Sequence, residues 1–112
     1  MLVSRLIFTV FLTSTATVES AASAMAAEPD AGRQKELVRL VRQDCGSCHG
    51  MTLQGGLGPA LLPADLRGKP AEGLVATIYY GRPGTPMPPW QQFMSEAEAG
   101  WIVEKLMSGF PN

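Results

Sequence analysis

Cys45-Gly46-Ser47-Cys48-His49 decides the fold and the chemistry of this chain. The stretch holds both cysteines and the only histidine of the 112 residues. Two thiols three positions apart can both bond to the vinyl groups on one edge of a porphyrin, and the imidazole of the next residue can then reach the iron. This pattern is typical of covalent haem attachment. We therefore predict one haem c per chain, bound through Cys45 and Cys48, with His49 as an axial iron ligand.

Three other uses of the cysteine pair fit the sequence less well. A redox-active dithiol of this spacing belongs to a β-α-β setting, which the sequence does not indicate. A zinc site of four Cys or His ligands is excluded, because the chain has only three such residues, Cys45, Cys48 and His49. A disulfide across so short a loop would add little stability.

The sequence before the motif has the composition of an export signal. Arg5 precedes an apolar run over 6–12 and then small residues, which end in Ala24-Met25-Ala26. We expect 1–26 to be a signal peptide that is cleaved on export to the periplasm, leaving 27–112 as one monohaem domain. A retained membrane anchor is the alternative, but the run is much shorter than the roughly 20 apolar residues of a bilayer span.

Helical periodicity on both sides of the motif predicts an all-α domain with three main helices. We expect these helices over 33–44, 70–80 and 96–107. The first should give way at Gly46, and the third should open with a capping box formed by Ser95 and Glu98. No run of alternating β-branched residues indicates a strand.

Two long loops join these helices. Residues 45–64 contain no Lys, Arg, Asp or Glu, and 82–94 contain four prolines and a single charge, that of Arg82. Such long loops are unusual in a small domain. They become reasonable if both wrap one apolar cofactor, which would then serve as part of the core and stabilise a domain of this size.

The composition excludes several other functions. The chain is 46% hydrophobic and 17% charged, with a net charge of −1. This balance supplies no basic field for nucleic acid and is too apolar for a disordered chain. No His or Cys remains for nucleophilic or hydrolytic catalysis, so we expect an electron-transfer protein and no enzyme.

Met87 is the predicted ligand on the other face of the iron. Met1 and Met25 belong to the signal peptide, Met51 is too close to His49 in sequence, and Met94 and Met107 are expected to pack in the core. Met87 lies between Pro86 and Pro88, and stiffening by proline lowers the entropy lost when the thioether is held against iron. The alternative is an ordinary exposed loop methionine.

A backbone carbonyl is the expected partner of the His49 ring. An axial histidine generally donates its second ring N–H to a fixed acceptor. Pro59 offers such a carbonyl at a plausible distance along the chain. Possible donors to the haem propionates are Arg67, Tyr79, Arg82 and Trp90, although the two aromatic residues suit the core equally well.

The ordered set Cys45-x-x-Cys48-His49, Gly58-Pro59-x-Leu61, Met87-Pro88 and a capped last helix resembles the class I c-type cytochromes over about 36–107. The resemblance implies the small cytochrome c fold, in which the first and last helices cross. It also implies His49 and Met87 as ligands, with the Pro59 carbonyl on the His49 ring. The chain departs from the family at Lys105, where many members carry an aromatic residue, while Trp101 lies a turn earlier.

The segments 45–53 and 81–90 look most like the small periplasmic cytochromes of the 55X type, which are found with haem-d nitrite reductase in denitrifying bacteria. This resemblance implies a monomeric single-electron carrier whose partner is nitrite reductase or another periplasmic redox protein. Two alternatives stay open. One is a redox accessory for maturation of haem d, and the other is a haem ligand sensor with a labile Met87.

Overall fold

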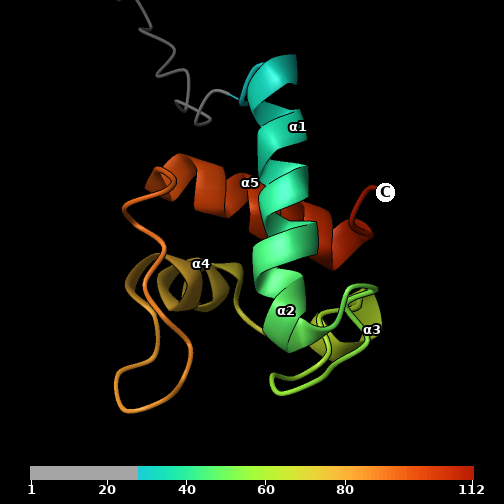
Figure 1. The fold of residues 1–112 in the computed structure, drawn as a ribbon, viewed down its shortest axis with the longest axis vertical. Coiled ribbons are helices and arrows are strands. Elements are labelled where there is room, and N and C mark those ends of the chain that lie inside the picture. The colour runs from blue at the N-terminus through green and yellow to red at the C-terminus, as the bar shows by residue number, and fades with distance from the viewer. Residues whose placement is uncertain (1–27) are drawn as a thin grey trace, which may run out of the picture.

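The computed structural model describes residues 28–112, and a continuous helical segment opens this part of the chain (Figure 1). The segment consists of α1 (Ala31–Leu40), the π-helical turn η1 (Val41–Cys45) and α2 (Gly46–His49). Asp30 caps its start, because its carboxylate accepts the Arg33 backbone N–H at 2.9 Å. The expected end at Gly46 is wrong, since the helix continues to His49 and stops only at Gly50. The predicted signal peptide, 1–26, lies outside the described residues.

A short helix that the sequence analysis missed overlaps the end of the first predicted loop, 45–64. This helix, α3, spans Pro63–Leu66. Pro63 suits a first helical turn because its missing N–H would have no partner there, and Leu66 buries its side chain at 3% exposure. Four residues are too few to show a helical period, so hydrophobic patterning could not reveal this element.

The two later helices lie where their sequences predict. Helix α4 spans Ala71–Tyr80, with Pro70 as its N-cap, and it ends at Gly81. Helix α5 spans Glu96–Ser108. The Ser95 hydroxyl accepts the Glu98 N–H at 3.1 Å and the Glu98 carboxylate accepts the Ser95 N–H at 2.8 Å, which confirms the capping box. The described residues contain no strand, so the all-α prediction is confirmed.

Helix α5 is the element around which the described residues pack. It lies across α1 in Figure 1 and also packs against α4 and α3. The buried hydrophobic core joins the first helix, the loops and α5 through Leu37, Val41, Leu53, Leu66, Met94, Ala99, Trp101, Ile102 and Leu106. None of the described helices is long and apolar enough to cross a membrane.

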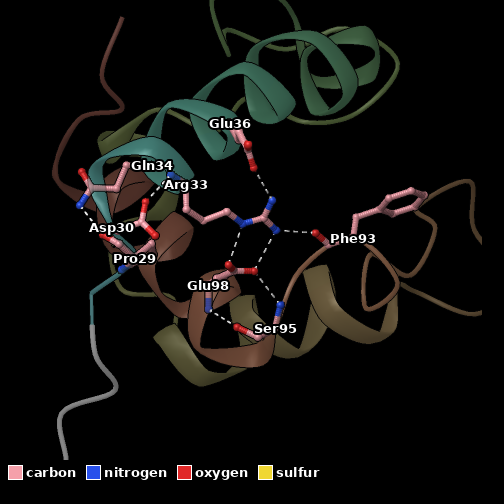
Figure 2. Close-up of polar contacts among 8 residues, drawn as sticks. All are labelled: Pro29, Asp30, Arg33, Gln34, Glu36, Phe93, Ser95 and Glu98. Atoms are coloured by element: carbon pink, nitrogen blue, oxygen red, sulfur yellow. Dashed lines mark hydrogen bonds and ion pairs between the residues drawn. The ribbon is translucent and has the colours of Figure 1, made fainter.

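The beginnings of α1 and α5 are joined by a charged network centred on Arg33 (Figure 2). Its guanidinium donates to both Glu98 oxygens, at 2.7 and 3.0 Å, and to the Phe93 carbonyl at 2.7 Å. A further N–H donates to Glu36 at 2.9 Å. This pairing raises the pKa of Arg33 and lowers the pKa of Glu98, so both groups are held in their charged forms.

Lys105 stands where many class I cytochromes carry an aromatic residue, and in this chain Trp101 supplies the aromatic ring instead. Trp101 is buried, at 6% exposure, and its ring N–H donates to the Glu28 carboxylate at 3.3 Å. The Lys105 ammonium lies 5.5 Å from the centre of the Trp101 ring. Trp101 therefore contacts the segment just before α1, from a position one turn earlier along α5 than Lys105.

Candidate haem site

Both cysteines of the motif lie at the end of the first helical segment. Cys45 is the last residue of η1, Cys48 belongs to α2, and both are half-buried free thiols. Burial, followed by the neighbouring charge of Asp44, raises the pKa of the Cys45 thiol to about 11. Catalytic dithiols show the opposite shift, because they need a thiolate near neutral pH.

The His49 ring is oriented by the predicted backbone carbonyl. Its Nδ1 lies 2.7 Å from the carbonyl oxygen of Pro59. A carbonyl can only accept, so Nδ1 carries the proton in this contact, and the neutral ring then presents its Nε2 lone pair to a metal. This is the arrangement that an axial histidine requires.

Gly58 is a site residue that the sequence analysis did not assign to the histidine. A Cβ at this position would lie 2.8 Å from both Cε1 and Nδ1 of His49, so only glycine lets the loop pass flat against the ring. The Gly58 N–H also donates to the Cys48 carbonyl at 2.8 Å, and the Gly55 N–H to the His49 carbonyl at 2.8 Å. The signal in the sequence was the Gly-Pro pair itself, which fixes the loop against α2.

Met87 lies in a second, separately braced loop that follows α4. The Arg82 N–H donates to the Met87 carbonyl at 3.1 Å, and the Thr85 hydroxyl donates to the Arg82 carbonyl at 2.6 Å. The Trp90 N–H donates to Ile78 of α4 at 3.0 Å, which fixes the far end of the loop. Met87 itself is half-buried. The structure thus brings Cys45, Cys48, His49 and Pro59 together and holds Met87 in a different loop, where its role as a ligand stays a prediction.

The surroundings of these residues suit an apolar cofactor. Helix α4 has no fully buried residue, although Leu74, Val75 and Ile78 pack against the core. Leu61 and Trp90 are likewise only partly buried at the core boundary. No buried polar or charged residue is found among 28–112. Two free thiols, an imidazole with an available Nε2 and a half-covered apolar boundary therefore fit a covalently attached haem.

The four residues predicted as donors to the haem propionates have no contact that assigns them this role. Arg67 and Arg82 are exposed. Tyr79 stacks edge-on against Tyr80 at 4.9 Å, and Trp90 lies 5.6 Å from Phe93. Contacts of these four residues with haem propionates stay predictions. An open cleft of about 550 Å³ between α4 and α5 contains none of the predicted ligands, and its floor includes Val75, Val103 and Met107.

Comparison with known proteins first defines the class. Residues 32–104 match the family described as cytochrome c oxidase, cbb3-type, subunit III. The chain is also 63% identical over 81 residues to cytochrome c55X of Pseudomonas aeruginosa, which covers 72% of this chain and 68% of the relative. Cytochrome c55X of Paracoccus denitrificans is 49% identical over 87 residues, 78% of this chain and 84% of that protein. These matches define a c-type cytochrome, and hence a haem-binding electron-transfer protein and no enzyme.

A solved structure narrows the assignment. The c-type cytochrome NirC is 61% identical, with a TM-score of 0.72 over 73% of this chain and 96% of that one. The chain belongs to the family of small c-type cytochromes of the 55X type.

One further relative is an enzyme that contains a similar segment. Dihydro-heme d1 dehydrogenase of Pseudomonas aeruginosa is 41% identical over 73 residues, which amount to 64% of this chain and only 15% of the enzyme. The structure titled dihydro-heme d1 dehydrogenase NirN in complex with DHE aligns with a TM-score of 0.59 at 35% identity, over 66% of this chain and 16% of that one. The resemblance thus concerns a small part of the enzyme.

Proposed function

We propose that this chain is a periplasmic monohaem cytochrome that carries single electrons to a nitrite reductase of the haem-d type. In this proposal residues 1–26 direct export, and Cys45 and Cys48 attach one haem through thioether bonds. His49 Nε2 and the Met87 sulfur are the axial ligands. The observation that carries the proposal is the 2.7 Å contact between His49 Nδ1 and the Pro59 carbonyl, beside two free thiols.

The bound haem supplies a one-electron Fe(II)/Fe(III) couple. The protein's own residues set the conditions for this couple. The Pro59 carbonyl fixes the tautomer and the plane of the His49 ring. It also makes the Nε2 lone pair a stronger ligand for iron. The hydrogen-bonded, proline-rich loop restricts the position of Met87. The iron ligands therefore rearrange little between the two oxidation states. A thioether favours Fe(II), and we therefore expect a relatively high reduction potential.

Apolar residues near the two loops provide the docking surface in this proposal. Both loops extend toward the α2 end of the molecule in Figure 1. Met51, Leu57 and Leu62 are exposed on the first loop, with Leu57 at 95% exposure. Tyr80 and Phe93 are exposed at either end of the second. Small apolar contacts are typical of the weak encounters through which redox proteins exchange electrons.

A mass and an absorption spectrum of the purified protein test this function. We expect the mass of the cleaved chain plus one haem, and a weak band in the far red of the oxidised spectrum from the thioether–iron bond. A mass without haem would reject the proposal at its first step. Haem without the far-red band would reject Met87 ligation and favour the ligand-sensing alternative.

A second candidate function is electron exchange during maturation of the haem-d cofactor. The similarity of this chain to a segment of dihydro-heme d1 dehydrogenase supports it. Deleting the gene and purifying nitrite reductase separates the two functions. A reductase that lacks its d-type haem would favour maturation, whereas a complete reductase that turns over slowly in the cell would favour electron supply.

A further inference from the structure

The π-helical turn η1 ends at Cys45, the first residue of the haem-attachment motif, and a turn of this kind adds one residue to a helix. Its defining hydrogen bond runs from the Gly46 N–H to the Val41 carbonyl, five residues back. In an uninterrupted α-helix that carbonyl would accept from Cys45 instead. Single π-helical turns are rare and often mark functional sites.

The added residue changes which side chains face the packed side of the helix. Leu37 and Val41, four residues apart, form a buried line on this side at 0% and 1% exposure. The α-helical repeat would continue the line with Cys45 and then His49. In the structure Gly46 is the buried residue that follows Val41, and Cys45 is only partly buried at the edge of the core.

Gly46 and Gly50 both lie where a Cβ would meet the next loop. A Cβ at Gly46 would lie 3.4 Å from the Met51 Cα and 3.5 Å from the Met51 sulfur, which is ordinary van der Waals contact. A Cβ at Gly50, whose φ is 90°, would lie 2.7 Å from the Gly55 carbonyl oxygen. A side chain at Gly50 would therefore be forced against the loop, whereas the Gly46 position has room for a Cβ.

The turn is held by contacts to two other parts of the chain. The Arg42 guanidinium donates to the Pro111 carbonyl at 2.8 Å and to the Met51 carbonyl at 3.4 Å, and it lies 5.4 Å from the centre of the Phe110 ring. Within the bend, the Ser47 hydroxyl donates to the Asp44 carbonyl at 2.7 Å. These contacts join the turn to the first loop and to the segment after α5.

We propose that η1 adds one residue to the helix and so places Gly46, in place of Cys45, after Val41 on the buried side. Cys45, Cys48 and His49 then stay half-buried at the edge of the core, where a haem can be attached. This inference rests on the proposed function, because it assigns the turn a role only if haem is attached there. The number of residues between Val41 and Cys45 then matters more than their identity, and η1 is a positioning element for the axial ligand.

The first test determines, in the wild-type holoprotein, which backbone N–H donates to the Val41 carbonyl. In the reduced, low-spin state, through-hydrogen-bond NMR couplings identify the donor to each carbonyl. We expect a coupling between the Gly46 nitrogen and the Val41 carbonyl carbon. A coupling from the Cys45 nitrogen to that carbon would overturn the proposal, whatever happens to any variant.

The second test removes one residue from the turn. Gln43 is exposed, and its deletion lets the segment close as a regular α-helix, while the Gln43→Ala substitution keeps the length as a matched control. We expect wild type and Gln43→Ala to show one attached haem and the far-red thioether–iron band. The deletion variant should keep the haem mass, lose that band and bind carbon monoxide.

Each result has a distinct meaning. A deletion variant with the band at wild-type intensity would overturn the proposal for η1 and leave the proposed function intact. Wild-type protein without attached haem would instead reject the proposed function. If the deletion variant does not accumulate, the NMR coupling in the wild type decides the question.

Discussion

Glu98 is the residue on which the junction between α1 and α5 depends. It accepts two hydrogen bonds from Arg33 and one from the Ser95 backbone, and its side chain is 19% exposed (Figure 2). Glu36 also accepts from Arg33 but is 66% exposed. Because solvent screens exposed pairs strongly, the two carboxylates contribute unequally.

We expect Glu98→Gln to lower the free energy of unfolding by about 1–2 kcal/mol at neutral pH, and Glu36→Gln by less than about 0.5 kcal/mol. Arg33 lowers the pKa of Glu98 in the folded state, so the stabilisation is fully present above the unfolded pKa of about 4.3 and is lost as the pH falls through the folded pKa. Denaturant titrations of the three proteins between acid and neutral pH measure this. Equal pH profiles for both variants would contradict it.

Met87 is the proposed sixth ligand of the iron, and its removal should change the spectrum. We expect Met87→Ala to lose the low-spin spectrum and the far-red band and to bind carbon monoxide rapidly when reduced, because the sixth position then opens. Met94→Leu is the control, since Met94 is buried at 5% exposure in the core. An unchanged spectrum in Met87→Ala would show that another group binds the iron.

At the scale of elements, α5 contains a glycine that it does not need for packing. Gly100 lies in the helix interior, and a Cβ there would meet nothing within 4 Å. We expect Gly100→Ala to stabilise the protein by roughly 0.5–1 kcal/mol, because alanine has the higher helix propensity. Gly109→Ala is the contrast, since Gly109 has equal space but a φ of 113°, and it should destabilise the protein. Thermal unfolding measures both, and stabilisation by Gly109→Ala would contradict the argument.

Comparison of the helices shows which of them could be predicted from the sequence. Hydrophobic periodicity and the Ser95–Glu98 pair were sufficient for α4 and α5, because their signals are local. The π-helical turn leaves no local signal: it depends on contacts of Arg42 with the first loop and with the segment after α5. Helix α3 is too short for a period. Neither a tertiary contact nor a single four-residue turn leaves a periodic pattern in the sequence, so these two elements were missed.

At the scale of the whole molecule, charge is almost absent from the two long loops. Since salt suppresses steering by charge, we expect the rate of electron transfer to nitrite reductase, the proposed partner, to fall less than about tenfold between low and physiological ionic strength. Stopped-flow mixing over a salt series measures this rate. A larger fall would mean that the partner docks on a charged face instead.

The candidate site was predictable from the sequence to the extent that its ligands are adjacent. The closeness of Cys45, Cys48 and His49 can be predicted without a structure, because these residues lie within about one helical turn of one another. The contact of Pro59 with His49 was expected both from the need of an axial histidine for a fixed acceptor and from the resemblance, and the fold supplies its distance. The closeness of Gly58 to the ring could not be predicted, because it depends on how the loop returns across α2.

The two tryptophans give the molecule a pair of optical reporters. Trp101 is buried in α5, whereas Trp90 is half-buried at the end of the loop that carries Met87. A nearby haem quenches tryptophan emission by energy transfer, so each indole brightens when its surroundings move away from the cofactor. In a Trp101→Phe variant the emission would follow local opening of the Met87 loop, and in a Trp90→Phe variant it would follow global unfolding. Coincident transitions in the two variants would mean that the loop opens only when the whole molecule unfolds.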